Sequence, residues 1–181
     1  MNKSLSLLPL LVLLLLLGGC KKAVDSLPLT FNVDDSSTVQ VPASGPLTGV
    51  LLTLPGFTVN STSNATFAAN KTAANYVQDV TLNRLNLTVT DPTTQNFDFL
   101  KRIEIYIATD AAGTNKILLA SLNPVPTGQT TLALTPTTAK LDTYLRGNSY
   151  ALFVTAELAQ PLRQNTTLRI DSRFSVRATL P

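Results

Sequence analysis

After residue 28, apolar and polar side chains alternate along most of the chain with a period of two residues, which is typical of β-strands that bury one face. The most regular segment is 102–107, where isoleucines occupy every second position between charged or phenolic side chains. We therefore expect this segment to be a central strand with its isoleucines in the core. Alternation also predicts strands at 29–33, 39–41, 50–54, 80–89, 116–122, 129–134, 150–156 and 168–180.

Breaks in the alternation indicate the other expected features. The phase changes at Asn83-Arg84, which predicts a β-bulge, and turn residues separate the strands, most clearly over 110–115. Only residues 138–146 carry apolar side chains at helical spacing, and no long helical repeat exists to connect parallel strands. The sequence therefore predicts an all-β fold, an antiparallel immunoglobulin-like β-sandwich of about eight or nine strands.

The N-terminus has the layout of a signal peptide. Lys3 precedes an apolar run over 5–17, which is followed by two glycines and Cys20. A helix needs about 20 residues to cross a hydrocarbon core about 30 Å thick, so this run is too short to be a permanent span. The expected parts of the chain are a signal peptide at 1–19, a lipidated tether at 20–27 and a β-sandwich domain at 28–181.

The tetrapeptide Leu17-Gly18-Gly19-Cys20 resembles the lipobox of bacterial lipoprotein precursors. The resemblance implies cleavage between Gly19 and Cys20 and lipidation of the Cys20 thiol. Together with the strand pattern, it makes the chain similar to small Gram-negative envelope lipoproteins of unknown function. That similarity implies a fold and a location but no catalytic residues. The alternative is an ordinary secretory leader that contains a cysteine by chance.

The residues after Cys20 bear on the location of the domain. Lys21 and Lys22 are placed to contact anionic headgroups, at about 1 kcal/mol each near the membrane surface. An Asp after the cysteine would resemble the inner-membrane retention signal of some Gram-negative bacteria, and here the residue is Lys21. We expect a lipid-anchored domain in the cell envelope, and the outer membrane is favoured. The domain could face either the periplasm or the cell surface.

Composition argues against catalysis and against nucleic-acid binding. The chain has no His and one Cys, which removes the commonest general base, the usual metal ligand and any internal disulfide. It carries 14 basic and 11 acidic side chains, and the basic ones are scattered apart from Lys21-Lys22. We expect a protein that is not an enzyme, with no cofactor, no metal ion and no nucleic-acid partner.

Two acidic segments, Asp34-Asp35 and 110–115, carry oxygen atoms of the kind that calcium binds. Neither has ligands at about every second position followed by a bidentate Glu, as a calcium loop requires. Local hydrogen bonds in turns are the better interpretation of both segments.

The segment 56–75 is rich in Asn, Thr and Ala, and its bulky apolar residues are Phe57, Val59 and Phe67. It is predicted to be a long exposed connection or a weak edge strand. Because loops on rigid scaffolds often bind partners, it is the first candidate for a contact surface, with these three residues as its anchors. The alternative is a solvated loop that has no partner.

Two classes of function remain. The first is a membrane-held, non-catalytic binding module that presents loops or an edge strand to an envelope protein or glycan. The second is a structural subunit of the envelope or of a pilus-like assembly that grows by strand addition. Ser26 is a candidate O-glycosylation site, because Asp25-Ser26-Leu27 resembles the short Asp-Ser/Thr-apolar signal of some Gram-negative groups.

Overall fold

The computed structural model describes residues 28–46 and 49–180. The predicted signal peptide, the tether and three predicted site residues, Gly19, Cys20 and Ser26, lie outside the described residues. The described strands are β1 (Leu29–Val41), β2 (Leu51–Thr53), β3 (Phe57–Asn60), β4 (Val77–Asp91), β5 (Leu100–Ala108), β6 (Ile117–Leu122), β7 (Thr131–Pro136), β8 (Ser149–Leu158) and β9 (Thr166–Ala178). The helices are α3 (Ser63–Ala69) and α4 (Asp142–Leu145), with 3₁₀ turns at Ala74–Tyr76 and Phe97–Phe99.

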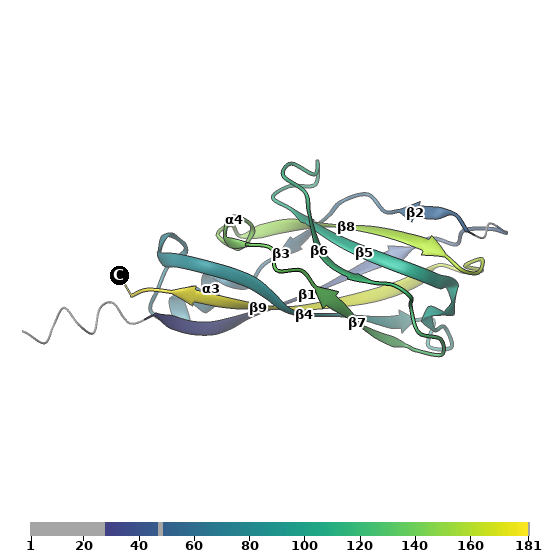
Figure 1. Ribbon diagram of the computed structural model, residues 1–181, viewed down its shortest axis with the longest axis horizontal. Helices are drawn as coiled ribbons and strands as arrows, with labels where there is room; N and C mark the ends of the chain where they lie inside the picture. Colours follow the sequence, from purple (N-terminus) through teal and green to yellow (C-terminus); the bar gives the residue numbers. More distant parts are fainter. Residues whose placement is uncertain (1–27, 47–48, 181) are drawn as a thin grey trace, which may run out of the picture.

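These strands form one antiparallel sheet in the order β1-β9-β4-β7-β6-β5-β8-β2, with β3 also paired to β8. The sheet curls so that its two halves lie over each other (Figure 1). Across the space between them, the ring of Tyr150 on β8 lies 5.9 Å from that of Phe174 on β9, centroid to centroid. The prediction of an all-β, antiparallel fold is therefore confirmed.

The strand order corrects the expectation of an immunoglobulin-like sandwich. In that fold the first strand pairs with the second, whereas here β1 pairs with the last strand, β9. With β2 and β3 together in the place of one strand, the halves β1-β9-β4-β7 and β6-β5-β8-β2 have the order of an eight-stranded jelly roll. Period-two alternation is common to both folds, so it does not distinguish one strand order from the other.

Several local predictions are confirmed. On β5 the side chains of Ile103, Ile105 and Ile107 are at most 1% exposed, as the alternation indicated. The pairing of β4 with β9 shifts register between Leu82 and Arg84, where the phase change predicted a bulge. The helical turn expected within 138–146 is α4.

The long strands give the domain two distinct ends. Leu29 on β1 faces Ala178 on β9 at one end, and Val41 faces Thr166 at the other. The second end, here called the distal end, carries the connections 42–50, 92–99, 123–130 and 159–165. Because β1 has 13 residues, the distal end lies about 40 Å from the point where the chain enters the domain, at about 3.3 Å per residue.

Candidate functional site

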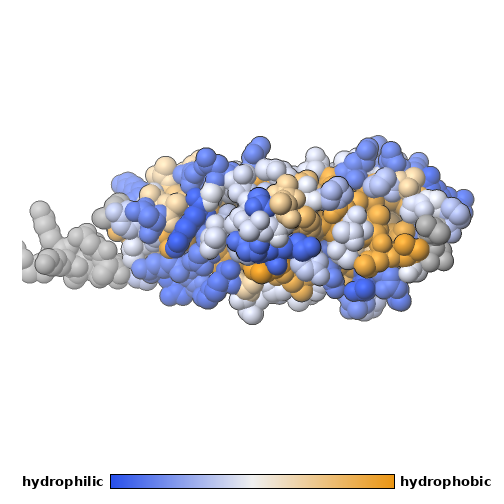
Figure 2. Space-filling view, turned by 90° about the horizontal axis from the view of Figure 1, so that it is seen from above, coloured by the Kyte–Doolittle hydropathy of each residue, from blue (hydrophilic) through white to orange (hydrophobic). Residues whose placement is uncertain are grey.

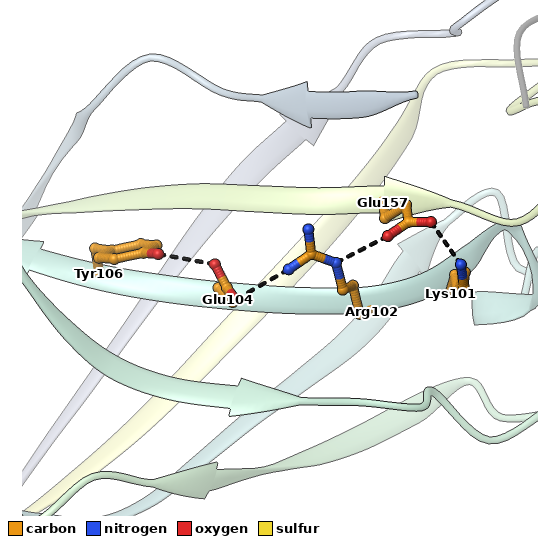
Figure 3. A network of polar contacts seen from close by, with 5 residues as sticks. All are labelled: Lys101, Arg102, Glu104, Tyr106 and Glu157. Atoms are coloured by element: carbon orange, nitrogen blue, oxygen red, sulfur yellow. Dashed lines mark hydrogen bonds and ion pairs between the residues drawn. The ribbon is translucent and has the colours of Figure 1, made fainter. Parts of the chain in front are cut away.

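The outer face of β5 and β8 carries a connected group of charged and phenolic side chains, here called the polar strip (Figure 3). The alternation that buries the isoleucines of β5 leaves the intervening side chains on the outside. β8 runs antiparallel beside β5 and contributes one carboxylate. The strip consists of Lys101, Arg102, Glu104, Tyr106 and Glu157.

Each member of the strip bonds to a neighbour. The Lys101 ammonium lies 2.7 Å from Oε1 of Glu157, and Nε of Arg102 lies 2.9 Å from Oε2 of the same carboxylate. Nη1 of Arg102 also contacts Oε1 of Glu104 at 3.2 Å. The Tyr106 hydroxyl donates to Oε2 of Glu104 at 2.8 Å. The result is a chain of contacts along β5 in which both carboxylates have cationic or hydroxyl partners (Figure 3).

A β-bulge explains how two consecutive residues reach one carboxylate. Leu100 pairs with Leu158 and Arg102 with Glu157, so β5 has one residue more than β8 over this step. The extra residue is Lys101. Since a bulge rotates the side chains beside it, Lys101 and Arg102 both point toward Glu157 instead of toward opposite faces.

These contacts stabilise the ordinary neutral-pH protonation states of Glu157, Arg102 and Tyr106. Hydrogen bonds from Lys101 and then from Arg102 lower the pKa of Glu157, and the bond to Glu157 raises the pKa of Arg102. The hydrogen bond to Glu104, followed by partial burial, raises the pKa of Tyr106. At neutral pH the strip therefore presents a carboxylate, a guanidinium and a protonated phenol, which is an arrangement suited to recognition by hydrogen bonds and charge.

Aromatic rings extend the strip along the same face. Tyr106 lies opposite Phe153 in the pairing of β5 with β8. The Lys116 ammonium lies 5.3 Å from the centroid of the Tyr106 ring and 5.0 Å from that of Phe153. Gly56 lies directly against the Phe153 ring, where a Cβ would clash. The Lys116 ammonium thus lies over both rings, and Gly56 packs against the Phe153 ring.

The structure corrects the contact surface predicted for 56–75. Val59 is 2% exposed and Phe67 is 1% exposed, so neither side chain is available to a partner. Phe57 is half-buried and packs against the core. The segment forms β3 and α3, and the Phe67 ring lies edge-on to Phe31 of β1 at 6.0 Å. These three residues therefore serve packing, because they occupy the apolar face that β3 and α3 turn inward.

Asp34 and Asp35, interpreted from the sequence as turn residues, lie in the middle of β1. Asp35 is only 4% exposed. Its carboxylate accepts a hydrogen bond from the Ser61 hydroxyl at 2.9 Å and one from the Thr62 backbone N–H at 2.7 Å. It ties the start of α3 to β1, which gives this buried charge a structural role.

Tyr150 lies beside this buried carboxylate. The residue is 1% exposed, and burial, together with the negative charge of Asp35, raises the pKa of its hydroxyl well above the ordinary value. The sequence offered no sign of this pair, because the two residues are more than a hundred positions apart.

The turn predicted at 110–115 is confirmed. The Asp110 side chain accepts a hydrogen bond from the Thr114 backbone N–H at 3.1 Å, which lowers the pKa of Asp110. Within residues 28–46 and 49–180, no cluster of three or more Cys, Asp or Glu side chains is arranged to hold a metal ion. Nor does this part of the chain contain a helix long and apolar enough to span a membrane.

No protein-family model matches the chain, and a search of curated proteins found no match. Among solved structures, the chain is similar to the capsid protein of a 60-mer BFDV particle, at 11% identity and a TM-score of 0.40, over 87% of this chain and 97% of that one. It is also similar to desmodium yellow mottle tymovirus, at 10% identity and a TM-score of 0.28, over 86% of this chain and 91% of that one. Turnip yellow mosaic virus matches at 12% identity and a TM-score of 0.27, over 84% of this chain and 96% of that one. TM-scores this low support no conclusion about this chain.

Proposed function

We propose that this chain is a lipid-anchored protein of the cell envelope whose domain is a non-catalytic binding module, with the polar strip as its contact surface. The observation that carries the proposal is the strip itself. Five side chains hold one another in place on an outward sheet face, and the side chains of Arg102, Glu104 and Glu157 remain 35%, 29% and 21% exposed. Side chains already ordered in the free protein lose little conformational freedom when a partner binds.

The chemistry of the strip favours a polar partner such as an envelope glycan or protein. Lys101 and Arg102 are balanced by Glu104 and Glu157, so the strip has no excess of positive charge to follow a phosphate backbone. Hydrogen-bond donors and acceptors alternate along it, and the Tyr106 and Phe153 rings add apolar area. Both carboxylates are held by ion pairs or hydrogen bonds, which favours recognition over acid–base chemistry.

Anchoring through Cys20 in the outer membrane completes the proposal. The lipobox-like sequence at 17–20 is the support for it, together with the short distance in sequence from Cys20 to the start of β1 at Leu29. A domain tethered at that point would extend its distal end away from the membrane by about 40 Å, given about 3.3 Å per strand residue.

Site-specific photo-crosslinking in living cells tests the contact surface. A photoreactive amino acid replaces Thr155, which lies between Thr53 and Glu104 in the sheet. The matched control is Thr81, another half-buried threonine on an outward face, but in the other half of the sheet. We expect a discrete adduct with an envelope component from position 155 and none from position 81. No adduct at 155, or equal adducts at both positions, would contradict the proposed contact surface.

A structural subunit that grows by strand addition is the second candidate, and the position of β1 favours it. β1 has 13 residues, and in the described sheet β9 is its one strand partner. On its other edge the Asp34 carbonyl accepts a hydrogen bond from the Thr62 hydroxyl, and no described strand lies beside the rest of that edge. Under this proposal the protein forms elongated assemblies in cell extracts, and Thr38→Pro disrupts them by removing a backbone donor from that edge. Particles of monomer size in wild-type extracts would exclude this candidate.

A further inference from the structure

The edge strand β2 offers unpaired backbone groups on its outer side. On either side of β2, hydrogen bonds to β8 involve even-numbered residues: the Val50 carbonyl accepts from the Leu158 N–H at 3.1 Å, and the Leu54 N–H donates to the Val154 carbonyl at 2.9 Å. Because backbone groups in an antiparallel strand point alternately to the two sides, those of Leu51 and Thr53 point away from β8. No strand lies beyond β2 in the described part of the sheet.

Apolar side chains are exposed at the same strand. Leu51 is 54% exposed and Val50 is 39% exposed, and these are the large hydrophobic side chains that the described residues leave exposed. Figure 2 shows apolar surface gathered toward this distal end, on the right of the view. An unpaired backbone edge and exposed apolar side chains therefore coincide, which is the combination used by proteins that accept an added strand.

A cleft with a volume of about 380 Å³ opens at the distal end, between residues 43–46 and residues 161–163. Two proline rings and the Leu162 side chain give it apolar walls, and Arg163 stands at its side. Arg163 makes no ion pair within the described residues. A partner segment that carries a carboxylate next to an apolar side chain would complement this cleft.

We propose that the free edge of β2 accepts an extended peptide segment of a partner protein, which adds to the sheet as a further strand. The groups that bind it are the N–H and C=O of Leu51 and Thr53, with the Leu51 and Val50 side chains packing on its apolar residues. A carboxylate of the segment pairs with Arg163. This inference rests on the proposed binding function and identifies the partner as a protein with an extended, apolar and acidic segment.

The added strand would lie on the far side of β2 from β8 and β5, the strands that carry the polar strip. Leu51 faces Glu157 and Thr53 faces Thr155 across the β2–β8 pair. Side chains on the outer face of the new strand would therefore continue the row that the strip begins. The edge of β1 differs, because its outward residues carry polar, exposed side chains and the Asp34 carbonyl accepts a hydrogen bond from the Thr62 hydroxyl at 2.9 Å.

The test uses a displayed library of random 12-residue peptides, selected on the full chain in detergent. We expect selected peptides to have apolar residues at alternate positions and an acidic group. Thr53→Pro removes only the outward N–H of β2, a substitution that an edge strand tolerates, and it should weaken binding at least tenfold. Thr53→Ala keeps the N–H and should bind as the wild type does.

A second measurement leaves the protein unchanged. Methylating alternate backbone nitrogens of a selected peptide should abolish binding in one phase of alternation and spare it in the other, since only one set of N–H groups faces β2. Equal binding by Thr53→Pro and Thr53→Ala, or the absence of any selected peptide, would overturn the inference, as would self-association of the protein that Thr53→Pro abolishes. If the photo-crosslinked adducts from position 155 persist in the Thr53→Pro variant, the polar strip binds its partner without the free edge of β2.

Discussion

Asp35 and its neighbour Asp34 show how one step along a strand changes the role of a carboxylate. Asp35 is buried and accepts hydrogen bonds from Ser61 and Thr62, whereas the Asp34 side chain is 56% exposed and pairs with Arg173. Asp35→Ala should lower the free energy of unfolding by about 2–3 kcal/mol, because charged hydrogen bonds are lost and a buried N–H is left unpaired. Asp34→Ala should cost about 1 kcal/mol or less. Urea unfolding measures both, and equal losses would contradict the assigned roles.

The buried hydroxyl of Tyr150 predicts a loss of stability in alkali. Its pKa is raised in the folded protein, so the folded state favours the protonated phenol. The stabilising effect is complete below the unfolded-state pKa of about 10 and is lost as the pH rises toward the folded-state value. The urea concentration at the unfolding midpoint is measured at neutral pH and again above the unfolded-state pKa. The decrease between these two pH values should be larger for the wild type than for Tyr150→Phe. A parallel fall in both proteins would show that other groups cause the alkaline sensitivity.

At the scale of elements, the two faces of β5 can be tested against each other. Ile105 is fully buried, and an unpaired charge there should cost several kcal/mol out of a total stability of about 5–15 kcal/mol. Ile105→Asp should therefore unfold the domain. Glu104→Lys breaks partly exposed contacts with Arg102 and Tyr106 and should cost about 1 kcal/mol. Circular dichroism in urea distinguishes the two, and similar small losses would contradict the assigned faces.

The helix α3 gives a second test at this scale. Phe67 is 1% exposed, so Phe67→Ala should cost about 3–5 kcal/mol, the range for removing a buried aromatic side chain. Phe57→Ala should cost less, because that ring is already half-exposed to solvent. Thermal unfolding of both variants measures the difference. If Phe67→Ala is as stable as the wild type, the assignment of Phe67 to the core is contradicted, and the exposed contact role predicted from the sequence is favoured.

Alternation predicted the regular strands well and failed where polar residues point inward. It located β5 and the bulge of β4, because each has apolar residues on one face. It treated β1 as two short strands, since Asp35 and Ser37 occupy inward positions that a pattern of apolar residues does not include. For 56–75 it allowed a long exposed connection or a weak edge strand, and the segment does contain the short strand β3. It missed α3 and the burial of Phe67, because Ala and Thr give little apolar signal.

Part of the polar strip could be predicted in the same way. The outward side chains of β5 follow from its alternation, but their bonds to Glu157 depend on which strand lies beside β5. β5 and β8 are about fifty residues apart, and no local sequence pattern indicates that two such distant strands pair. Nor does any local pattern indicate that β1 pairs with β9. Alternation alone therefore led to the immunoglobulin strand order and not to the order that the structure has.

At the scale of the whole molecule, the proposed anchor, Cys20, precedes the first described residue in the sequence. The core of the described residues lies between the two halves of the sheet and draws on strands from both ends of the described chain. Changing Cys20 should therefore alter where the protein is and leave its stability unchanged.

Cys20→Ser should release a folded protein into the soluble fraction of the envelope or into the medium. Each acyl methylene buried in the membrane contributes about 0.8 kcal/mol, so several chains hold the protein firmly and their loss frees it. Metabolic labelling with a palmitate analogue, followed by fractionation, measures both attachment and location. The wild type should take up the label and sediment with membranes, and the variant should do neither while unfolding at the same temperature as the released wild-type domain. A wild type without label would refute the proposal that this chain is a lipoprotein, and the polar strip and the β2 edge would then have to be tested as surfaces of an untethered protein.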